Sequence, residues 1–304
     1  MLLETDYDIS KLTSFKIGGK VKKVYFPETV DEFTQILKTE PDALVVGNLS
    51  NILVSSKGYN GILICTKRMD EIEFEGNIVT ASAGVRGTKL SKLAAAERLS
   101  GLEFMIAFPG SVGGEVYMNA GAHGQMIADV LKTARIYSPD TGIIELSNDE
   151  MGFDYRTSIC QKKPYIVLDA AFELTPDSAE NIQERMNKNL NFRQDKQPSL
   201  TLPNCGSVFK NPENDSAGRL LESVGAKEFR AGGARVFEKH ANFIINENSA
   251  TSLDVLTLMD KMSSAVENKY GIKLVPEVRY LGGNDEREVE LCRKLQIESI
   301  KIQK

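Results

Sequence analysis

The segment 204–212, which reads NCGSVFKNP, brings a hydroxyl, an ammonium and an amide together at Ser207, Lys210 and Asn211. Gly206 lets the backbone approach a ligand closely, and Pro212 ends the element by removing a hydrogen-bond donor. We expect a strand with Ser207 and Phe209 on one face and Val208 and Lys210 on the other. Taken alone, the segment is better interpreted as a solvated strand end, so any chemical role depends on what the rest of the chain brings to it.

A second segment, 101–124, reads GLEFMIAFPGSVGGEVYMNAGAHG. Its glycines are too dense for a regular helix, and the segment is too apolar for a linker. Clustered main-chain N–H groups bind anions, so the segment is a candidate phosphate cradle. A tight connection between packed elements explains it equally well. The segment contains neither G-x-G-x-x-G nor a Walker A sequence, which argues against a Rossmann fold or a P-loop.

Composition restricts the class of protein. The chain has 304 residues, enough for two or three domains, and a net charge of −5. This charge argues against nucleic acid or an anionic membrane as the main partner. We see no membrane span and no signal peptide, so we expect a cytoplasmic protein. The four scattered cysteines indicate reduced thiols, and the two distant histidines argue against a metal site.

Hydrophobic periodicity predicts the elements of the first half. We expect a strand at 13–19, a helix at 30–38 with an apolar face, and strands at 43–46, 62–65 and 78–81. The helix at 88–99 should turn Leu90, Leu93, Ala94 and Leu99 inward. The sequence SPDTG at 138–142 predicts a hairpin, followed by a strand at 165–174 and a charged helix at 178–194.

The second half begins after the DKQP sequence at 195–198, which is the best candidate for a domain boundary. We expect a short helix at 217–224 and a strand at 241–245. The capping sequence TSLD begins a helix at 251–270 that buries Leu253, Leu256, Met259, Met262 and Val266. A strand is expected at 274–281. The tail after Gly283 is charged and is compatible with a helix.

Several of these segments together resemble the UDP-N-acetylenolpyruvoylglucosamine reductase (MurB) family. The matching segments occur in the family's order along the chain: TSFKIGG at 13–19, SNILV at 50–54, GLEF at 101–104, PGSVGG and MNAGAHG within 109–124, YRTS at 155–158, CGSVFKNP at 205–212, HANFIIN at 240–246 and PEVRYLG at 276–282. The short spacing from YRTS to CGSVFKNP resembles the shorter subtype, which lacks a tyrosine-bearing lid loop.

The resemblance implies an α+β fold: a vanillyl-alcohol-oxidase-like (PCMH-type), two-part FAD-binding region plus a separate α/β substrate-binding domain. The first FAD-binding subdomain is expected at 1–68, with 271–304 returning to it. The second is expected at 69–198, and the substrate-binding domain at 199–270.

The activity implied by the resemblance is an NADPH-dependent, FAD-mediated oxidoreduction. It converts UDP-N-acetylglucosamine enolpyruvate to UDP-N-acetylmuramate in peptidoglycan precursor synthesis, and so serves cell wall biogenesis, cell shape and cell division. The implied partners are small molecules, the UDP-sugar enolpyruvyl ether and NADPH. Neither nucleic acid nor a membrane is implied, and a monomer is expected.

The reaction needs a fixed cation at the substrate carboxylate and a positioned proton donor. By the family motifs, Arg156 is the cation, Ser207 the proton donor, and Glu277 orients the developing enolate. Tyr155, Lys210 and Asn211 match substrate-binding positions. The expected FAD-binding residues are Gly47, Asn48, Ser50, Asn51, Pro109, Gly110, Ser111, Gly113, Gly114, Asn119, Gly121 and Arg279.

The chain departs from the family's pattern at positions in the flavin half: Leu12, Leu49, Ala107 and Glu115. A side chain at Leu49 would crowd a backbone approach to phosphate that glycine permits. Two alternatives therefore stay open. One is another flavin oxidoreductase of the same fold acting on a different small anion, and the other is a non-catalytic relative that binds a nucleotide sugar.

Overall fold

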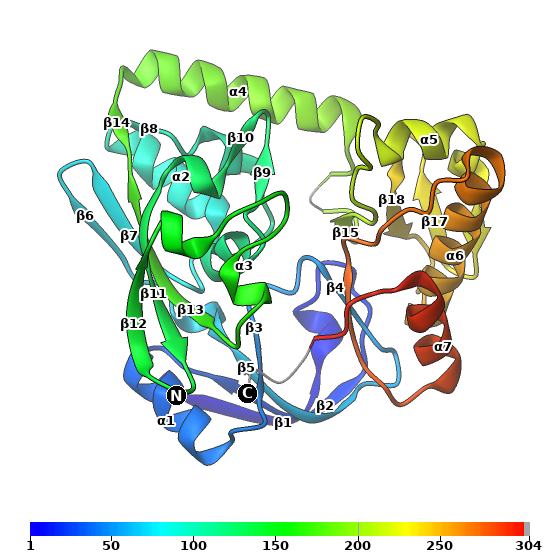
Figure 1. The fold of residues 1–304 in the computed structure, drawn as a ribbon, viewed down its shortest axis with the longest axis horizontal. Coiled ribbons are helices and arrows are strands. Elements are labelled where there is room, and N and C mark those ends of the chain that lie inside the picture. Colours follow the sequence, from blue (N-terminus) through cyan, green and yellow to red (C-terminus); the bar gives the residue numbers. More distant parts are fainter. Residues whose placement is uncertain (200, 301–304) are drawn as a thin grey trace.

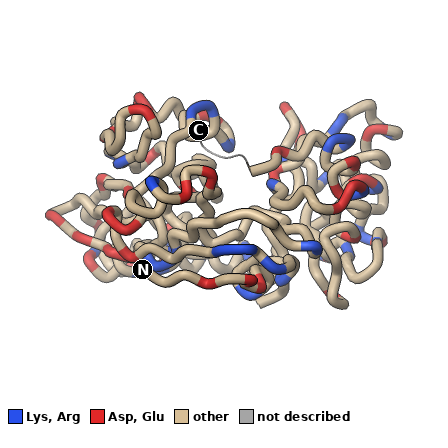
Figure 2. The backbone as a smooth tube through the Cα atoms, turned by 90° about the horizontal axis from the view of Figure 1, so that it is seen from below, with Lys and Arg blue, Asp and Glu red and all other residues tan. Residues whose placement is uncertain are grey.

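The computed structural model describes residues 1–199 and 201–300, so Leu200 and the end of the tail, 301–304, lie outside the described residues. Three principal sheets carry the fold, and they belong to successive parts of the chain (Figure 1). In the described part, no helix is long and apolar enough to cross a membrane. Acidic and basic residues are interspersed over the whole molecule (Figure 2).

The first sheet has the order β1-β2-β5-β3, formed by β1 (Leu2–Asp8), β2 (Lys20–Phe26), β5 (Tyr59–Cys65) and β3 (Leu44–Val46). β2 and β3 each pair in parallel with β5, which requires a crossover, and α1 (Val30–Thr39) provides it. The helix begins at Thr29, whose side chain accepts a hydrogen bond from the Glu32 amide. The predicted helix and its buried face are confirmed.

The strand predicted at 13–19 is wrong. The alternation did identify the buried side chains, because Thr13, Phe15 and Ile17 are all buried. However, the Thr13 hydroxyl donates to the Ile17 carbonyl at 2.9 Å, and Lys16 takes a left-handed φ of 56°. The segment thus closes on itself as a loop instead of pairing with a neighbouring strand.

The second sheet is entirely antiparallel, with the order β12-β11-β13-β7-β6. Its strands are β6 (Ile72–Glu75), β7 (Ile78–Ser82), β11 (Leu131–Ser138), β12 (Gly142–Ser147) and β13 (Ile166–Glu173). The predicted hairpin is β11–β12, which is confirmed. Shorter strand pairs join β8 (Leu99–Ser100) to β14 (Thr175–Pro176) and β9 (Gly121–Ala122) to β10 (Gln125–Met126).

Helices α2 (Gly87–Ala96), α3 (Val112–Tyr117) and α4 (Ala179–Lys196) belong to this second part, and α4 runs along the top of the molecule (Figure 1). Leu90 and Ala94 are buried on α2 as predicted, but Leu93 is 37 % exposed. The inward orientation predicted for Leu93 is therefore wrong. Helix α2 also ends before Leu99, which is buried in β8.

The third sheet has the order β15-β18-β17-β16, formed by β15 (Asn204–Ser207), β18 (His240–Asn246), β17 (Ala234–Phe237) and β16 (Arg230–Ala231). Helices α5 (Ala217–Ser223) and α6 (Ser252–Tyr270) accompany it. The predicted capping box is present, because Thr251 and Asp254 each accept from the other's amide. The expected core residues of α6 are buried, except that Leu253 is only partly covered.

The C-terminal part of the chain returns to the first part of the molecule. β19 (Arg279–Leu281) pairs in parallel with β4 (Ile52–Val54), and α7 (Glu286–Leu295) packs on α6. The strand predicted at 274–281 is shorter than expected. Before β19 the chain bonds to the segment after β15, since the Lys210 amide donates to Val275 at 2.8 Å and the Glu277 amide to Val208 at 2.9 Å. The helix compatible with the tail is present at α7.

A buried carboxyl joins these parts. Glu288 on α7 accepts from the Ser252 hydroxyl at the start of α6 and, at 2.7 Å, from the Tyr280 hydroxyl on β19. Ser252 in turn accepts from the Ser56 amide at 2.7 Å, and Ser56 belongs to the turn after β4. The return of the chain is therefore held by buried hydrogen bonds as well as by apolar packing.

We expect Glu288→Ala to lower the free energy of unfolding by about 3 kcal/mol, because it leaves the Ser252 and Tyr280 hydroxyls buried without their acceptor. Urea unfolding measures this change. Glu290→Ala removes an exposed carboxylate from the same helix and should change the free energy by less than about 0.5 kcal/mol. Equal effects of the two substitutions would contradict a buried structural role for Glu288.

Candidate active site

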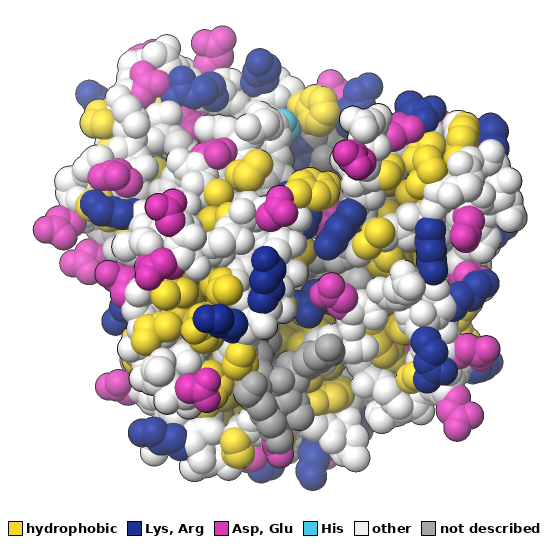
Figure 3. Space-filling model, in the orientation of Figure 1, with side chains coloured by type: hydrophobic (Ala, Val, Ile, Leu, Met, Phe, Trp, Pro, Cys, Tyr) yellow, Lys and Arg dark blue, Asp and Glu magenta, His cyan; other side chains and the backbone are white. Residues whose placement is uncertain are grey.

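A cavity of about 640 Å³, which we call the central cavity, opens between the three parts of the molecule. In Figure 3 the face toward the viewer is hollowed between the left and right parts, with basic and hydrophobic side chains at the border. Most of the predicted FAD-binding residues line the central cavity: Gly47, Asn48, Ser50, Asn51, Pro109, Gly110, Ser111, Gly113, Gly114, Gly121 and Arg279. Asn119 is not among the lining residues.

The glycines of the cavity wall permit a close approach of neighbouring side chains to the backbone. A Cβ atom added at Gly47 would lie 2.4 Å from the Ser111 hydroxyl oxygen, and one at Gly113 would lie 2.8 Å from the Ala83 methyl group. The Asn48 amide group also donates to the Pro109 carbonyl. A side chain at Gly47 would displace Ser111, and one at Gly113 would displace Ala83.

Several polar groups in the wall lack a hydrogen-bond partner in the part of the chain that the structure describes. Within the described residues, the Ser111 hydroxyl and the Arg279 Nε atom are buried without a hydrogen-bond partner. The remaining Arg279 nitrogens donate to the Tyr117 hydroxyl and pair with Glu298 at 3.5 Å, and the guanidinium lies 5.0 Å from the centre of the Tyr117 ring. A glycine-lined cavity with unsatisfied donors fits a dinucleotide cofactor such as FAD.

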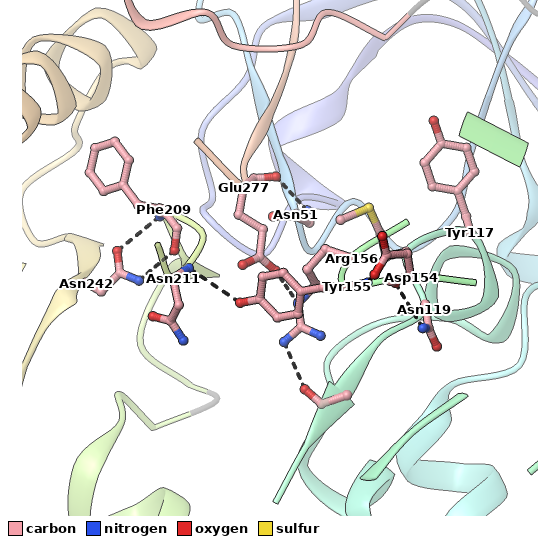
Figure 4. A network of polar contacts seen from close by, with 12 residues as sticks. Asn51, Tyr117, Asn119, Asp154, Tyr155, Arg156, Phe209, Asn211, Asn242 and Glu277 are labelled. Carbon is pink, nitrogen blue, oxygen red and sulfur yellow. Dashed lines mark hydrogen bonds and ion pairs between the residues drawn. The ribbon is translucent and has the colours of Figure 1, made fainter. Parts of the chain in front are cut away.

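Arg156 and Glu277 both line the central cavity and contact each other, although 121 positions separate them in the chain (Figure 4). Arg156 Nε donates to Glu277 Oε1 at 3.1 Å, and Nη2 donates to the Gly121 carbonyl at 3.0 Å. Burial raises the pKa of Glu277, while the nearby positive charges of Arg156 and Lys210 oppose that rise. The pair therefore combines a fixed cation with a carboxyl group that binds its proton more tightly than usual.

Several polar contacts hold this pair in place. Arg156 takes a left-handed φ of 54°, in the turn where Asp154 and Thr157 form a bridge. The Asn119 side chain donates to the Asp154 carbonyl at 3.0 Å and accepts from the Ala128 amide, so its amide group positions the turn from outside the cavity. The Asn51 side chain donates to the Glu277 carbonyl at 3.1 Å.

Ser207 also lines the central cavity, at the end of β15. The strand expected to run on to Lys210 ends at Ser207, and Val208 and Phe209 beyond it are both buried. Gly206 takes a φ of 79°, and the pairing of β15 with β18 shifts register between Asn204 and Ser207, so the strand twists and ends there. Since the Glu277 amide donates to the Val208 carbonyl, the segments that carry Ser207 and Glu277 are adjacent, and both residues line the cavity.

Asn242 fixes the backbone that follows Ser207, a role that we did not assign from the sequence. Its side chain accepts from the Phe209 amide at 3.0 Å and donates to the Phe209 carbonyl at 2.8 Å, while its own carbonyl accepts from the Val208 amide. The signal was present in the HANFIIN sequence, where an amide stands in the middle of an apolar strand. A buried amide in such a place needs partners.

The predicted substrate-binding residues lie beside the cavity and are not part of its lining. The Asn211 amide donates to the Tyr155 hydroxyl at 3.4 Å, which connects the second and third parts of the molecule (Figure 4). The Asn211 side chain accepts from the Ala217 amide at the start of α5. Lys210 is near enough to Glu277 to favour the ionised form of that carboxyl.

The lining also includes cations that sequence reasoning did not single out: Lys162, Lys163 and Arg193, together with His123. Burial lowers the pKa of Arg193, and that of His123 falls for the same reason. These residues are dispersed along the chain, so no local sequence motif predicts that they line one cavity. Lys162, Lys163 and Arg193, with Arg156 and Arg279, give the cavity an excess of positive groups, which suits an anionic ligand.

The positions that depart from the family pattern lie in or near the wall. Leu49 has a left-handed φ of 50°, and its side chain packs with Val46 and Val54. Leu12 packs partly buried against the same cluster, and Ala107 packs beside Ile182 and Met186 of α4. Glu115 is buried in the lining of the cavity.

We expect Asn242→Leu to lower the free energy of unfolding by about 3 kcal/mol, because the Phe209 amide and carbonyl would lose buried partners. Asn242→Asp is the matched control, since it keeps an acceptor for the Phe209 amide and should cost less. Chemical unfolding compares the two variants. If Asn242→Leu lowers the free energy of unfolding no more than Asn242→Asp does, the proposed role of Asn242 in fixing the Phe209 backbone is contradicted.

Comparison with known proteins identifies the family. Residues 197–281 match the family model of the UDP-N-acetylenolpyruvoylglucosamine reductase C-terminal domain, and residues 21–147 match that of an FAD binding domain. The chain is 40% identical to the UDP-N-acetylenolpyruvoylglucosamine reductase of Caldicellulosiruptor bescii, over 91% of this chain and 90% of the relative. It is also 40% identical to that of Bacillus subtilis, over 90% and 91%.

Among solved structures, the crystal structure of UDP-N-acetylenolpyruvylglucosamine reductase (MurB) from Thermus caldophilus matches with a TM-score of 0.81 and 29% identity. The match covers 92% of this chain and 100% of that one. These likenesses extend over both the glycine-lined wall and the Ser207 strand. The chain therefore belongs to the UDP-N-acetylenolpyruvoylglucosamine reductase family.

Proposed function

We propose that this protein catalyses the NADPH-dependent, FAD-mediated reduction of UDP-N-acetylglucosamine enolpyruvate to UDP-N-acetylmuramate, a step of peptidoglycan precursor synthesis. The observation that carries the proposal is the convergence of Arg156, Ser207 and Glu277 on one glycine-lined cavity from distant parts of the chain. When bound, FAD supplies the hydride-transfer chemistry, while the protein supplies placement and electrostatics.

Arg156 is proposed to hold the substrate carboxylate. A guanidinium has five N–H donors in a fixed fork, and the Arg156 contacts with Glu277 and Gly121 use only two of its nitrogens. The side chain can therefore bind a second carboxylate without leaving Glu277. Negative charge that builds on the substrate carboxylate during reduction would then meet a cation already in position.

Ser207 is proposed to donate the proton and Glu277 to orient the developing enolate. A serine hydroxyl is a weak acid, so it serves a strongly basic carbon centre and needs accurate placement. The Val208–Glu277 and Phe209–Asn242 hydrogen bonds on the following residues support such placement. Burial raises the pKa of Glu277 and the charges of Arg156 and Lys210 oppose that rise, so its carboxyl takes up a proton more readily than exposed carboxyl groups do.

The division of labour between the parts is also a proposal. We assign FAD to 1–68 with the returning 271–304 and to 69–198, and the substrate to 199–270, with Tyr155, Lys210 and Asn211 at the junction. Residues 47–51, 109–114, 121 and 279 would hold FAD, and Asn119 would act from behind the lining. We further propose a monomer that acts in the cytoplasm on small molecules, which sedimentation and cell fractionation would test.

The spectrum of the purified protein tests the reaction. The protein should be yellow with a flavin spectrum, NADPH should bleach that absorbance, and the enolpyruvyl sugar nucleotide should restore it without oxygen. A colourless protein that FAD cannot reconstitute would overturn the proposal. Recovery with oxygen alone would favour a flavin oxidoreductase with a different substrate.

We expect Ser207→Ala to slow the substrate half-reaction by about a hundredfold to ten-thousandfold, the usual effect of a lost proton donor. Reduction of the flavin by NADPH should stay near normal, because that step needs no proton from Ser207. Stopped-flow absorbance separates the two half-reactions. Ser207→Cys keeps a donor and should recover part of the rate, whereas equal losses in both half-reactions would contradict this role.

We expect Arg156→Lys to weaken use of the enolpyruvyl substrate by about tenfold to a hundredfold in kcat/KM, since an ammonium cannot grip a carboxylate in a fork. Flavin reduction by NADPH should change little. Arg135→Lys alters another arginine–carboxylate pair, with Asp169, outside the cavity lining, and is the matched control. A similar loss in the control would show that the effect is general.

A further inference from the structure

Glu115 places a buried carboxyl in the wall of the central cavity. Glu115 is 4 % exposed, and neither carboxyl oxygen has a hydrogen-bond partner among the described residues. The carboxyl fits against two glycines, because a Cβ atom at Gly87 would lie 2.4 Å from Oε1 and one at Gly110 would lie 2.9 Å from it. The two glycines thus leave space for the carboxyl group, but no described residue offers it a hydrogen bond.

This arrangement is unusual because a buried carboxylate without a partner is costly. Nearby, the Ser111 hydroxyl is also buried and unpaired within the described part of the chain. Both residues line the same cavity. The carboxyl is therefore shielded from water within the wall of the cavity, against Gly87 and Gly110.

No nearby positive side chain stabilises the ionised form of Glu115 among the described residues. The elements packed against α3 carry Asp169 on β13, which pairs with Arg135, and Cys160 in the 3-10 turn Ile159–Gln161. The start of α2 carries Arg86, as its N-cap residue, and Lys89, which pairs with Asp70 at 3.7 Å. Burial is the cause that raises the pKa of Glu115, to about 8.

The expected occupant of the cavity is an anion. Positive side chains in the lining are Arg156, Lys162, Lys163, Arg193 and Arg279, and FAD carries a pyrophosphate that suits them. A neutral Glu115 adds no negative charge to this wall. An ionised Glu115 would add a buried negative charge close to an anionic cofactor, which is unfavourable where the dielectric constant is low.

We propose that FAD binds tightly to this protein only while Glu115 is protonated, so that cofactor binding at alkaline pH takes up one proton and ionisation of Glu115 promotes release of FAD. This inference rests on the proposed function, in which the central cavity holds FAD. It assigns to Glu115 control over the pH range in which the enzyme keeps its cofactor.

The direction of the pH dependence follows from linkage. Below about pH 8 the carboxyl is protonated in both the free and the FAD-bound protein, so affinity does not depend on it. Above that pH the free protein is ionised while the bound protein keeps its proton. The dissociation constant for FAD should then rise, approaching tenfold for each pH unit.

Release of FAD from the holoenzyme tests the inference, followed by flavin fluorescence from pH 7 to pH 9.5. The wild type should lose affinity above pH 8, and calorimetry at pH 9 in buffers of different ionisation enthalpy should detect proton uptake on binding. Glu115→Gln has the same size but cannot ionise, so its affinity should stay flat over this range. Glu115→Ala should also be flat, and it serves if the glutamine variant folds poorly.

Glu145→Gln removes an exposed carboxylate of β12, outside the cavity lining, and should keep the wild-type pH dependence. Wild-type affinity that stays flat to pH 9.5, or a pH dependence that persists in Glu115→Gln, would overturn the inference. If either occurs while FAD binds and substrate is reduced at pH 7, the proposed function stands. If FAD binds at no pH, both the inference and the proposed function fail.

Discussion

The ion pair between Arg156 and Glu277 is the contact on which the site depends. It joins a turn of the second part of the molecule to the segment that returns from the third part to the first. Each partner is held independently, Arg156 by the Gly121 carbonyl and Glu277 by the Asn51 side chain and the Val208 carbonyl. Because both side chains are largely buried, removing either would leave an unpaired charge in the cavity.

The rest of the central cavity is lined by glycines and basic side chains, a combination that suits an anionic ligand. Gly47 lets Ser111 approach, Gly113 lets Ala83 approach, and Gly110 leaves room for the Glu115 side chain. Basic side chains from separate elements supply positive charge. Glu115 is the exception, since it adds an acidic group to a wall that suits an anion. Because burial raises the pKa of Glu115, the carboxyl is neutral at neutral pH and does not repel an anion. At alkaline pH it ionises, and the repulsion returns.

Much of the fold was predictable because the signals were local. Helices α1 and α6 follow from periodicity and capping residues, and the β11–β12 hairpin follows from its turn sequence. The errors have tertiary causes. The segment 13–19 buries alternate residues without a partner strand, and residues 274–278 bond to 208–210 before they reach β4. Sequence periodicity reports which side chains are buried but not which backbone pairs with which.

The sequence by itself determined the family, the chemical types at positions 156, 207 and 277, and the glycine-rich segments of the wall, because these are contiguous motifs. Only the tertiary structure decided that Asn242 fixes the backbone after Ser207, that Asn119 acts from behind the lining, and that the Glu115 oxygens have no partner among the described residues. The physical reason is that hydrogen-bond satisfaction and desolvation depend on groups distant in the chain, which no single motif contains.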